Sequence, residues 1–311
     1  MRLGRRHPIR LATLVGLAWL AAPPWAAGQP VFRTAIDLVN FGVTVVDRQG
    51  KPVGDLRRDD FEIVEAGTPQ KIQYFACGDR EGALPLRVGL LFDTSGSMEQ
   101  DASFARSAAI KFLNTLPRAE DFTLVDFATE VRVTRFSQAD FPRLVERIRT
   151  RKPEGETALY DALGVYLDGT MSEDGQKVLV LFTDGGDTSS AMTFGEALDL
   201  LRASDITLYV VGFLAHQSPS VREPQRLRTL QLAEATGGEA FFPPSIKHLD
   251  ESYGRILEEL GVRCTLGYQS TNRRADGAWR EVSIRVVRPD LKGAKVRTRK
   301  GYYAPYREGG Q

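Results

Sequence analysis

Cysteine and histidine are scarce in this chain of 311 residues, and its charges almost balance. The two cysteines, Cys77 and Cys264, allow a single disulfide in an oxidising compartment, with two buried free thiols as the alternative. The three histidines are scattered along the sequence and give no support to a histidine metal site; they are His7, His216 and His248. The formal net charge of +1 gives no general reason to expect nucleic acid as a partner.

After its first 28 residues the sequence also lacks any apolar stretch that approaches the ~20 residues of a membrane span. Those first residues are typical of an export signal. They begin with a positively charged region that contains Arg2, Arg5, Arg6 and Arg10. An apolar run from Leu11 to Ala22 follows, and then a cleavage site with the small residues Ala26 and Gly28. Cleavage would fall before Gln29, and a retained N-terminal anchor is the alternative. No cysteine follows the apolar run, which argues against a lipoprotein. We therefore expect an exported protein, secreted or periplasmic.

No repeats or low-complexity segments divide the chain, but its hydrophobic pattern changes twice. Residues 29–80 and 263–306 contain short runs in which apolar and polar residues alternate, as in half-buried antiparallel strands. One such run is AKVRTRKGYYAP, residues 294–305. Neither set has enough strands to close a core alone. Residues 84–262 lie between these two sets of strands, and residues 307–311 form a tail.

The central residues 84–262 have the pattern of an α/β domain. Two of the expected strands, LRVGLLFD at residues 86–93 and KVLVLFTD at residues 177–184, are apolar on both faces. Strands of this kind that alternate with helices form mostly parallel sheets covered on both sides. We therefore expect a doubly wound, mostly parallel sheet flanked by helices.

Polar residues follow these strands at the sheet edge where ligands bind in open α/β folds. They are Asp93, Ser95 and Ser97 after the first strand, Asp184 after the second, and Thr157 just before a helix. Mg²⁺ prefers about six oxygen ligands. Hydroxyls can bind it directly, and carboxylates can orient the ligands through water. The pattern therefore predicts one divalent metal site.

Two nearby carboxylates are not expected to bind this metal. Asp187 has the position of a turn or cap residue, because Asp and Gly are common in turns. Asp161 follows Thr157 by four residues and is expected to interact with the first turn of the helix and its dipole.

The segment DTSGSM at residues 93–98, Thr157 and the segment TDGGD at residues 183–187 resemble the metal-ion-dependent adhesion site of von Willebrand factor type A domains. All five expected positions are filled. Glu156 stands where relatives often carry glycine, and it could crowd or tune the rim of the site. The segments DDFEIVEAGTPQKIQYF and RKGYYAP, on either side of the domain, are similar to an exported family described from acidobacteria that has no established ligand.

This resemblance implies a six-stranded type A sheet, a Mg²⁺ or Mn²⁺ ion at the five residues, and a protein partner that supplies a Glu or Asp carboxylate. It also implies that the chain enters and leaves the central domain at neighbouring points, away from the metal. Cys77 lies just before the domain and Cys264 just after it. We therefore expect a disulfide between them, with a Cα–Cα distance of about 5.5 Å. The domain would then be inserted into a small β-sandwich formed by both chain ends.

Metal-dependent protein binding, in adhesion or in a scaffold, is the function that these features favour, without catalysis. A serine hydrolase would need a base close to Ser95 or Ser97. His216 and His248 are expected to lie away from the motif loops, and no G-x-S-x-G elbow is present. A phosphotransferase that used Asp93 would have a second aspartate at position 95.

Two further interpretations stay open. Similar cytoplasmic proteins act as substrate adaptors for ATP-driven chaperones or chelatases, a role against which the export signal argues. From Thr271 onward, eleven Lys and Arg residues stand against four Asp and Glu residues. A solvated strand face explains such an excess, and a surface for anionic polymers or headgroups is the alternative.

Overall fold

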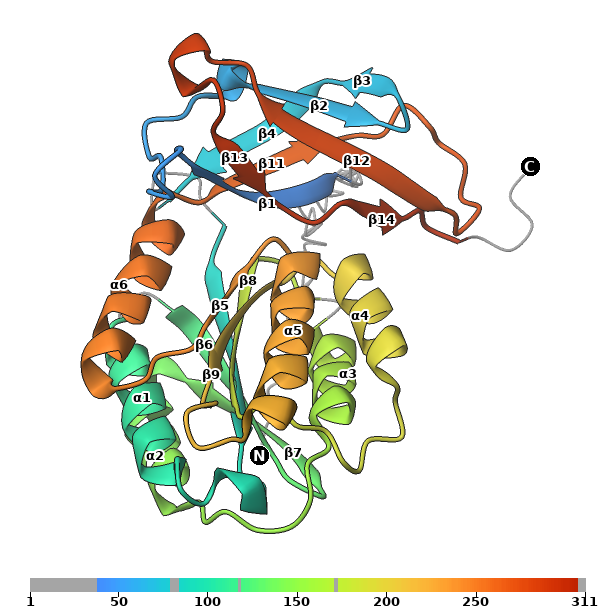
Figure 1. Cartoon of the computed structure of the whole chain (residues 1–311). Helices are drawn as coiled ribbons and strands as arrows, with labels where there is room; N and C mark the ends of the chain where they lie inside the picture. The colour runs from blue at the N-terminus through green and yellow to red at the C-terminus, as the bar shows by residue number, and fades with distance from the viewer. Residues whose placement is uncertain (1–37, 79–83, 117–118, 171–172, 307–311) are drawn as a thin grey trace, which may run out of the picture. The chain divides into compact units, whose positions relative to one another are not determined.

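The computed structural model describes residues 38–78, 84–116, 119–170 and 173–306 (Figure 1). The predicted export signal at residues 1–28 and the tail at residues 307–311 lie outside this part of the chain. Within it, no helix is long and apolar enough to cross a bilayer.

A six-stranded sheet forms the centre of the α/β domain, with the strand order β10-β9-β8-β5-β6-β7. Its strands are β5 (Leu86–Asp93), β6 (Ala119–Phe127), β7 (Val131–Ser137), β8 (Gln176–Thr183), β9 (Thr207–Gly212) and β10 (Glu239–Phe241). Neighbouring strands run parallel except β6 and β7, which are antiparallel. The doubly wound, mostly parallel sheet expected from the sequence is confirmed.

Helices cover both faces of this sheet (Figure 1). The helices are α1 (Ala102–Asn114), α2 (Phe141–Thr150), α3 (Leu159–Thr170), α4 (Phe194–Ala203), α5 (Pro219–Ala235) and α6 (Ile246–Val262). Alternate residues of β5 pack into different cores because successive strand side chains point to opposite faces. Leu90 lies in the core lined by α1, α2 and α6, whereas Leu91 lies in the core lined by α3, α4 and α5. This two-sided burial explains why the strand sequence is continuously apolar.

Helix α3 approaches the sheet closely at Gly89 of β5. A Cβ atom at Gly89 would lie 2.4 Å from ring atoms of Tyr166, so a larger residue would push α3 away from the sheet. The first residue of α3 is Leu159, two residues after Thr157. The close packing at Gly89 therefore helps to place Thr157 at the sheet edge.

Strands from both chain ends form two antiparallel sheets that share one core. The first sheet has the order β13-β1-β11-β4 and the second the order β14-β12-β2-β3. Their strands are β1 (Val39–Val46), β4 (Ile72–Cys77), β11 (Cys264–Tyr268) and β13 (Lys295–Arg297) in the first, and β2 (Phe61–Glu65), β3 (Thr68–Gln70), β12 (Trp279–Val286) and β14 (Gly301–Tyr303) in the second. Side chains of both sheets, such as Phe41 and Ile63, meet in the shared core, so the two sheets form a β-sandwich.

Short 3₁₀ helices interrupt the loops, at η1 (Arg58–Asp60), η2 (Gly96–Met98), η3 (Gln138–Asp140) and η4 (Pro289–Leu291).

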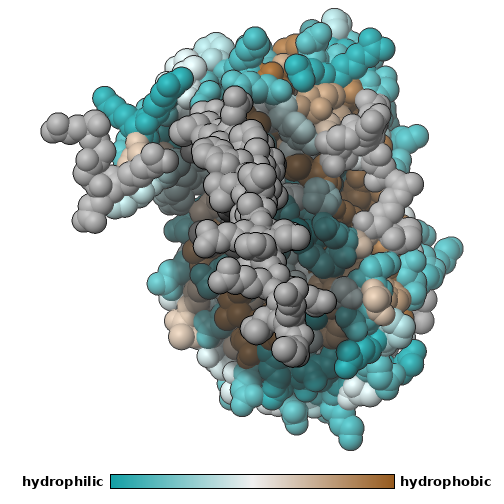
Figure 2. Space-filling view, turned by 180° about the vertical axis from the view of Figure 1, so that it is seen from behind, coloured by the Kyte–Doolittle hydropathy of each residue, from teal (hydrophilic) through white to brown (hydrophobic). Residues whose placement is uncertain are grey.

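Viewed from behind, the end of the α/β domain at the bottom of the picture is largely hydrophilic, and hydrophobic atoms are seen mainly further up (Figure 2). This hydrophilic end is the one where β5 and β8 finish (Figure 1).

The segment at residues 294–305 is divided between the two sheets of the sandwich. Lys295–Arg297 pairs with β1, whereas Gly301–Tyr303 pairs with β12. Arg299 lies between them, and its guanidinium donates to the carbonyl oxygens of Asn40, Ala203 and Ser204. The buried Arg299 thus connects the segment that crosses between the two sheets to the end of α4. The periodicity of the sequence alone does not indicate this division of the segment.

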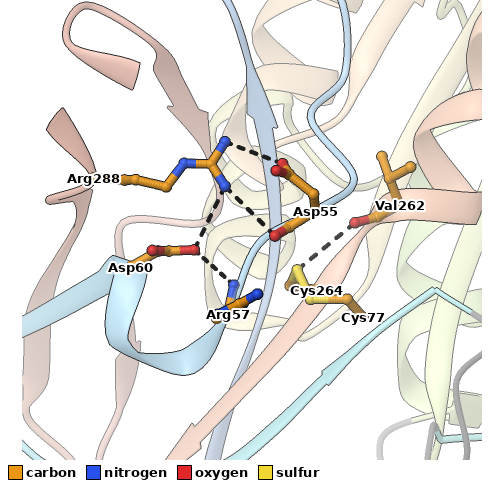
Figure 3. The surroundings of a disulfide bond; sticks show 7 residues. All are labelled: Asp55, Arg57, Asp60, Cys77, Val262, Cys264 and Arg288. Atoms are coloured by element: carbon orange, nitrogen blue, oxygen red, sulfur yellow. Dashed lines mark hydrogen bonds and ion pairs between the residues drawn. A yellow bond between two sulfur atoms is a disulfide. The ribbon is translucent and has the colours of Figure 1, made fainter. Parts of the chain in front are cut away.

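The predicted disulfide between Cys77 and Cys264 is confirmed (Figure 3). Cys77 ends β4 and Cys264 begins β11, and the two residues lie directly opposite each other in the antiparallel pair. The expected Cα–Cα distance of about 5.5 Å is wrong, because the Cα atoms are 3.9 Å apart. The Gly78 N–H donates to the Arg263 carbonyl, so the next pair along the strands, Cys77 and Cys264, is a non-hydrogen-bonded pair, in which opposed Cα atoms lie closest.

A salt-bridge group lies near the disulfide in Figure 3. The Arg288 guanidinium lies 3.0 Å from Asp55 Oδ1 and 3.8 Å from Asp60 Oδ2. Asp60 also accepts a hydrogen bond from the backbone N–H of Arg57. These contacts join the loop before β2 to the end of β12, so the two chain ends are connected beyond the strand pairing.

Candidate metal centre

The five predicted metal-site residues come from three loops at one edge of the central sheet. Asp93 is the last residue of β5, and Asp184 follows the end of the neighbouring parallel strand β8. Thr157 stands just before α3. Because parallel strands end at the same edge, Asp93 and Asp184 lie at the carboxyl side of the sheet, as the sequence predicts. The Thr157 loop connects two helices, and its backbone hydrogen bonds to the loop after Asp93 hold it at the same edge.

Asp93 is the centre of a compact hydrogen-bond network. Its Oδ1 accepts from the Ser95 backbone N–H at 3.0 Å and from Ser95 Oγ at 2.6 Å, and its Oδ2 accepts from Thr183 Oγ1 at 2.6 Å. Ser97 Oγ lies 3.1 Å from Ser95 Oγ. Asp93 and Ser95 are buried and Ser97 is exposed, so the network leads from the core to the surface.

Backbone hydrogen bonds hold the other two loops against this network. Gly155 adopts a φ of +75°, which favours glycine, and its carbonyl accepts from the Gly96 N–H at 2.9 Å. The Thr157 carbonyl accepts from the backbone N–H groups of Thr188 and Ser189, at 2.8 and 3.0 Å. Thr157 is thus joined to the loop that begins at Asp184, and the three loops form one connected edge.

The two carboxylates of the site are buried without a basic counterion. Neither Asp93 nor Asp184 forms an ion pair with a lysine or arginine within the described part of the chain, and both are at most 4% exposed. Burial, and secondarily the Asp184 charge, raises the pKa of Asp93 to about 7, against hydrogen bonds from Ser95 and Thr183 that lower it. A bound cation would supply the missing positive charge, so the residues present fit a divalent metal.

The donor set depends on hydroxyl groups. Among the residues that the structure describes, no three His, Cys, Asp or Glu side chains converge as a metal cluster. Ser95, Ser97 and Thr157 would therefore have to supply oxygen ligands beside Asp93 and Asp184. Hydroxyl and carboxylate oxygens suit hard cations such as Mg²⁺.

The structure places Asp187 and Asp161 in supporting positions. Asp187 Oδ1 accepts from the Tyr160 N–H at 3.2 Å and from Ser190 Oγ at 2.5 Å, at the start of α3. The Asp161 carboxylate accepts the backbone N–H groups of Ala191 and Met192, both at 2.9 Å. Both aspartates thus fasten the loop after Asp184 to the N-terminal turn of α3.

The expectation that His216 lies away from the motif loops is wrong. It follows β9 at the same sheet edge, and its Nδ1 lies 3.1 Å from Oδ1 of the buried Asp101, just after the first motif loop. The next residue, Gln217, donates from Nε2 to the Asp184 carbonyl at 3.1 Å. The loop that carries His216 cannot be placed from periodicity, because its position depends on the order of the strands. His248 hydrogen-bonds to Ser245 at the start of α6.

Sequence reasoning also missed the role of Thr183. Its hydroxyl donates to Asp93 and accepts a hydrogen bond from the Gly185 N–H at 3.0 Å. Thr183 therefore connects the loop after Asp93 to the loop that begins at Asp184. Its position as the last residue of β8, beside β5, could have indicated that its hydroxyl lies next to Asp93. Glu156, the departure from the family pattern, is exposed at the rim.

A sequence model of the von Willebrand factor type A domain matches residues 88–254. The chain belongs to this family. No curated protein matches the sequence.

Several solved structures are similar at low identity. The D319A mutant of the PilB minor pilin from Streptococcus sanguinis is 15% identical with a TM-score of 0.46; the match covers 58% of this chain and only 63% of the pilin chain. The vWF domain of the type V pili tip protein Mfa5 from Porphyromonas gingivalis is 12% identical with a TM-score of 0.47, over 58% of this chain and 97% of that domain. Proximal thread matrix protein 1 from the mussel byssus, with zinc in its MIDAS motif, is 18% identical with a TM-score of 0.44, over 60% of this chain and 49% of that one. At these values the likenesses assign no function.

Proposed function

We propose that this protein is an exported, metal-dependent binding module for a protein partner, in adhesion or in a scaffold. Its metal-ion-dependent adhesion site would consist of Asp93, Ser95, Ser97, Thr157 and Asp184. The observation that carries the proposal is the pair of buried carboxylates, Asp93 and Asp184, that lack a basic counterion among the described residues. Ser95 connects Asp93 by hydrogen bonds to the exposed hydroxyl of Ser97.

The proposed ligand set also specifies the partner. A Mg²⁺ or Mn²⁺ ion at this site would act as a Lewis acid toward an anionic oxygen ligand. Ser95, Ser97 and Thr157 are neutral donors, and Asp93 and Asp184 are proposed to orient the ligands through water, so the direct ligands leave much of the positive charge of a cation uncompensated. We therefore propose that a Glu or Asp carboxylate of the partner completes the site.

The hydrogen bonds of the site support binding rather than catalysis. Ser95 Oγ donates to Asp93, and neither Ser95 nor Ser97 hydrogen-bonds to a histidine within the described residues. His216 is engaged by Asp101, which lies outside the motif. A serine nucleophile needs a base within hydrogen-bond reach, so we propose that the chain is not an enzyme.

The exported location, and membership of the acidobacterial type of family, are proposed from the residues at positions 1–28 and from the two flanking motifs. The alternative is an adaptor for an ATP-driven chaperone or chelatase. Cell fractionation separates the two: a processed protein in the envelope or medium supports the exported module, whereas an unprocessed cytoplasmic protein supports the adaptor.

Isothermal titration with Mg²⁺ and Mn²⁺ tests the metal site directly. We expect one site in the wild-type protein, lost in Asp93→Ala and in Ser95→Ala/Ser97→Ala. Ser103→Ala/Ser107→Ala is the matched control, because it removes two exposed hydroxyls of α1 and should leave binding unchanged. Binding of undiminished affinity in both motif variants would refute the assignment. A pull-down from envelope and medium, with Mg²⁺ or with chelator, would then identify the partner.

A further inference from the structure

The loops around the candidate centre carry a large local excess of negative charge. Residues 93–99, 152–158 and 184–190 contain one basic side chain, Lys152. Against it stand the carboxylates of Asp93, Glu99, Glu154, Glu156, Asp184 and Asp187. The whole chain has a formal net charge of +1, so this formal excess of five negative charges is a property of the loop edge and not of the composition.

Three of these carboxylates, Glu99, Glu154 and Glu156, are exposed, and we call them the rim glutamates. Their backbone N–H groups are held in place: they donate to the Gly96 carbonyl at 3.2 Å, to the Thr94 carbonyl at 2.8 Å and to Thr129 Oγ1 at 2.9 Å, respectively. Within the described residues none of the three forms an ion pair, whereas the neighbouring Glu130 pairs with Arg132 at 2.7 Å. The rim glutamates thus stand on loops held by backbone hydrogen bonds, and in the described part of the chain their charges have no ion-pair partner.

An independent observation indicates that a cation belongs between these loops. Asp93 and Asp184, at the starts of two of these loops, are more than nine-tenths buried and have no basic counterion among the described residues. A divalent cation there would reduce the local excess from five negative charges to three. A partner carboxylate bound to the metal would raise it again to four. Such an edge repels a partner that brings only a carboxylate, since like charges at short range disfavour association.

We propose, on the basis of the proposed function, that the rim glutamates determine partner specificity. They select a protein segment whose coordinating Asp or Glu is flanked by lysine or arginine, and they reject segments with acidic flanks. The flanking cations neutralise Glu99, Glu154 and Glu156 while the carboxylate reaches the metal. Rejection by like charge is as much a part of this specificity as attraction.

Two synthetic heptapeptides test the proposal. Each has one central aspartate and glycine ends, and the four flanking residues are lysines in one peptide and glutamates in the other. A lysine peptide with asparagine at the centre measures binding without the coordinating carboxylate. Affinities would be measured for the whole protein, with saturating Mg²⁺ and with chelator, at low and at raised salt. Mg²⁺ binding would be measured separately by titration.

We expect the wild-type protein to bind the lysine–aspartate peptide at least about tenfold more tightly than the glutamate–aspartate peptide at low salt, with a smaller ratio at raised salt because exposed charges are screened. In Glu99→Gln/Glu154→Gln/Glu156→Gln the ratio should fall to within about threefold. The control Glu234→Gln/Glu251→Gln/Glu258→Gln makes the same change of charge at exposed positions of α5 and α6, and it should keep the wild-type ratio. The asparagine peptide should bind more weakly than its aspartate counterpart only when Mg²⁺ is present.

The outcomes separate the two proposals. A protein that binds Mg²⁺ but does not distinguish the lysine and glutamate peptides contradicts the rim specificity alone. Selectivity that persists in the rim variant, or that the control loses equally, also contradicts it. Failure to bind Mg²⁺ or Mn²⁺ at all contradicts both the metal site and the specificity built on it.

Discussion

Asp93 opposes folding of the metal-free protein, and in the proposed metal site the same side chain is needed for binding. The carboxylate ends a buried strand, faces the charge of Asp184 and has no basic counterion within the described residues. Its hydrogen bonds from Ser95 and Thr183 only partly compensate for its burial. A residue of this kind is expected where function, and not stability, determines the choice of amino acid.

Replacement of Asp93 by asparagine should stabilise the metal-free protein at neutral pH and abolish its response to metal. The pKa of Asp93 in the folded protein is raised from 3.8 to about 7, so the folded state binds this proton more tightly than the unfolded chain. The destabilisation caused by Asp93 is therefore complete above pH 7 and disappears as the pH falls from 7 towards 4. After the weaker contact with Thr183 is counted, we expect a gain of roughly 2 kcal/mol at pH 8 and little change at pH 4.

Denaturant unfolding of the two metal-free proteins at several pH values measures this difference. With Mg²⁺ at 100 times its dissociation constant, the wild-type protein should gain about 2.7 kcal/mol and Asp93→Asn nothing. An Asp93→Asn protein that is less stable than the wild type at pH 8, or that is still stabilised by Mg²⁺, would contradict this account of the site.

Asp126 is a second buried carboxylate near the same edge, but here basic side chains neutralise it. It is 1% exposed and forms ion pairs with Arg147, at 3.2 Å, and with Arg151. These arginines lie in α2 and just after it, so Asp126 fastens that helix to β6. Asp126→Asn should lower the free energy of unfolding, because it breaks both ion pairs. The loss should be limited to about 2–3 kcal/mol, because the freed arginines can reach water.

The control for Asp126→Asn is Asp199→Asn, which breaks an exposed pair with Arg202 and should cost less than about 0.5 kcal/mol. Chemical denaturation measures both variants. Equal effects of the two substitutions would show that burial of Asp126 adds nothing to its ion pairs.

Among the helices and strands, the contact between β5 and α3 connects core packing to the site. Gly89→Ala would place a methyl group 2.4 Å from the Tyr166 ring, and the ring cannot withdraw because it is 2% exposed. We expect a loss of about 2–3 kcal/mol in stability from this overpacking, and a weaker affinity for Mg²⁺ because Thr157 stands just before α3.

A double-mutant cycle with Tyr166→Leu tests this explanation. The smaller leucine side chain should leave room for the methyl group that Gly89→Ala adds. The double variant should therefore lose less stability than the sum of the losses in the two single variants. Strict additivity of the two substitutions would mean that the clash at Gly89 is relieved by some other movement.

The strands of the central sheet were predictable because burial on both faces leaves a continuous apolar signal, as in VLVLF of β8. Asp93 and Asp184 were predictable as neighbours because parallel strands end at one edge. His216 was misplaced because no periodic pattern reports where a loop lies relative to other loops. The division of residues 294–305 between two sheets was equally hidden, since it depends on the contacts of Arg299 with distant carbonyl groups.

Across the whole chain, the disulfide between Cys77 and Cys264 closes a loop of 187 residues that contains the α/β domain. It joins the strand before β5 to the strand after α6, whereas the candidate metal centre is at the other end of β5. The bond should therefore contribute to stability without affecting the metal site. In the chain-entropy model a loop of this length contributes up to ~5 kcal/mol, because the bond restricts the unfolded chain.

The variant Cys77→Ala/Cys264→Ala should lose about 3–5 kcal/mol of stability in denaturant unfolding and keep the Mg²⁺ affinity of the wild-type protein. Reduction of the wild-type protein should reproduce the loss in stability, and non-reducing mass spectrometry should show the intact protein two hydrogens lighter than its reduced form. Loss of Mg²⁺ binding in a variant that remains folded would indicate that the bond positions the loop edge through β5. Two free thiols in the purified protein would show instead that the strands β4 and β11 are held together by their pairing alone.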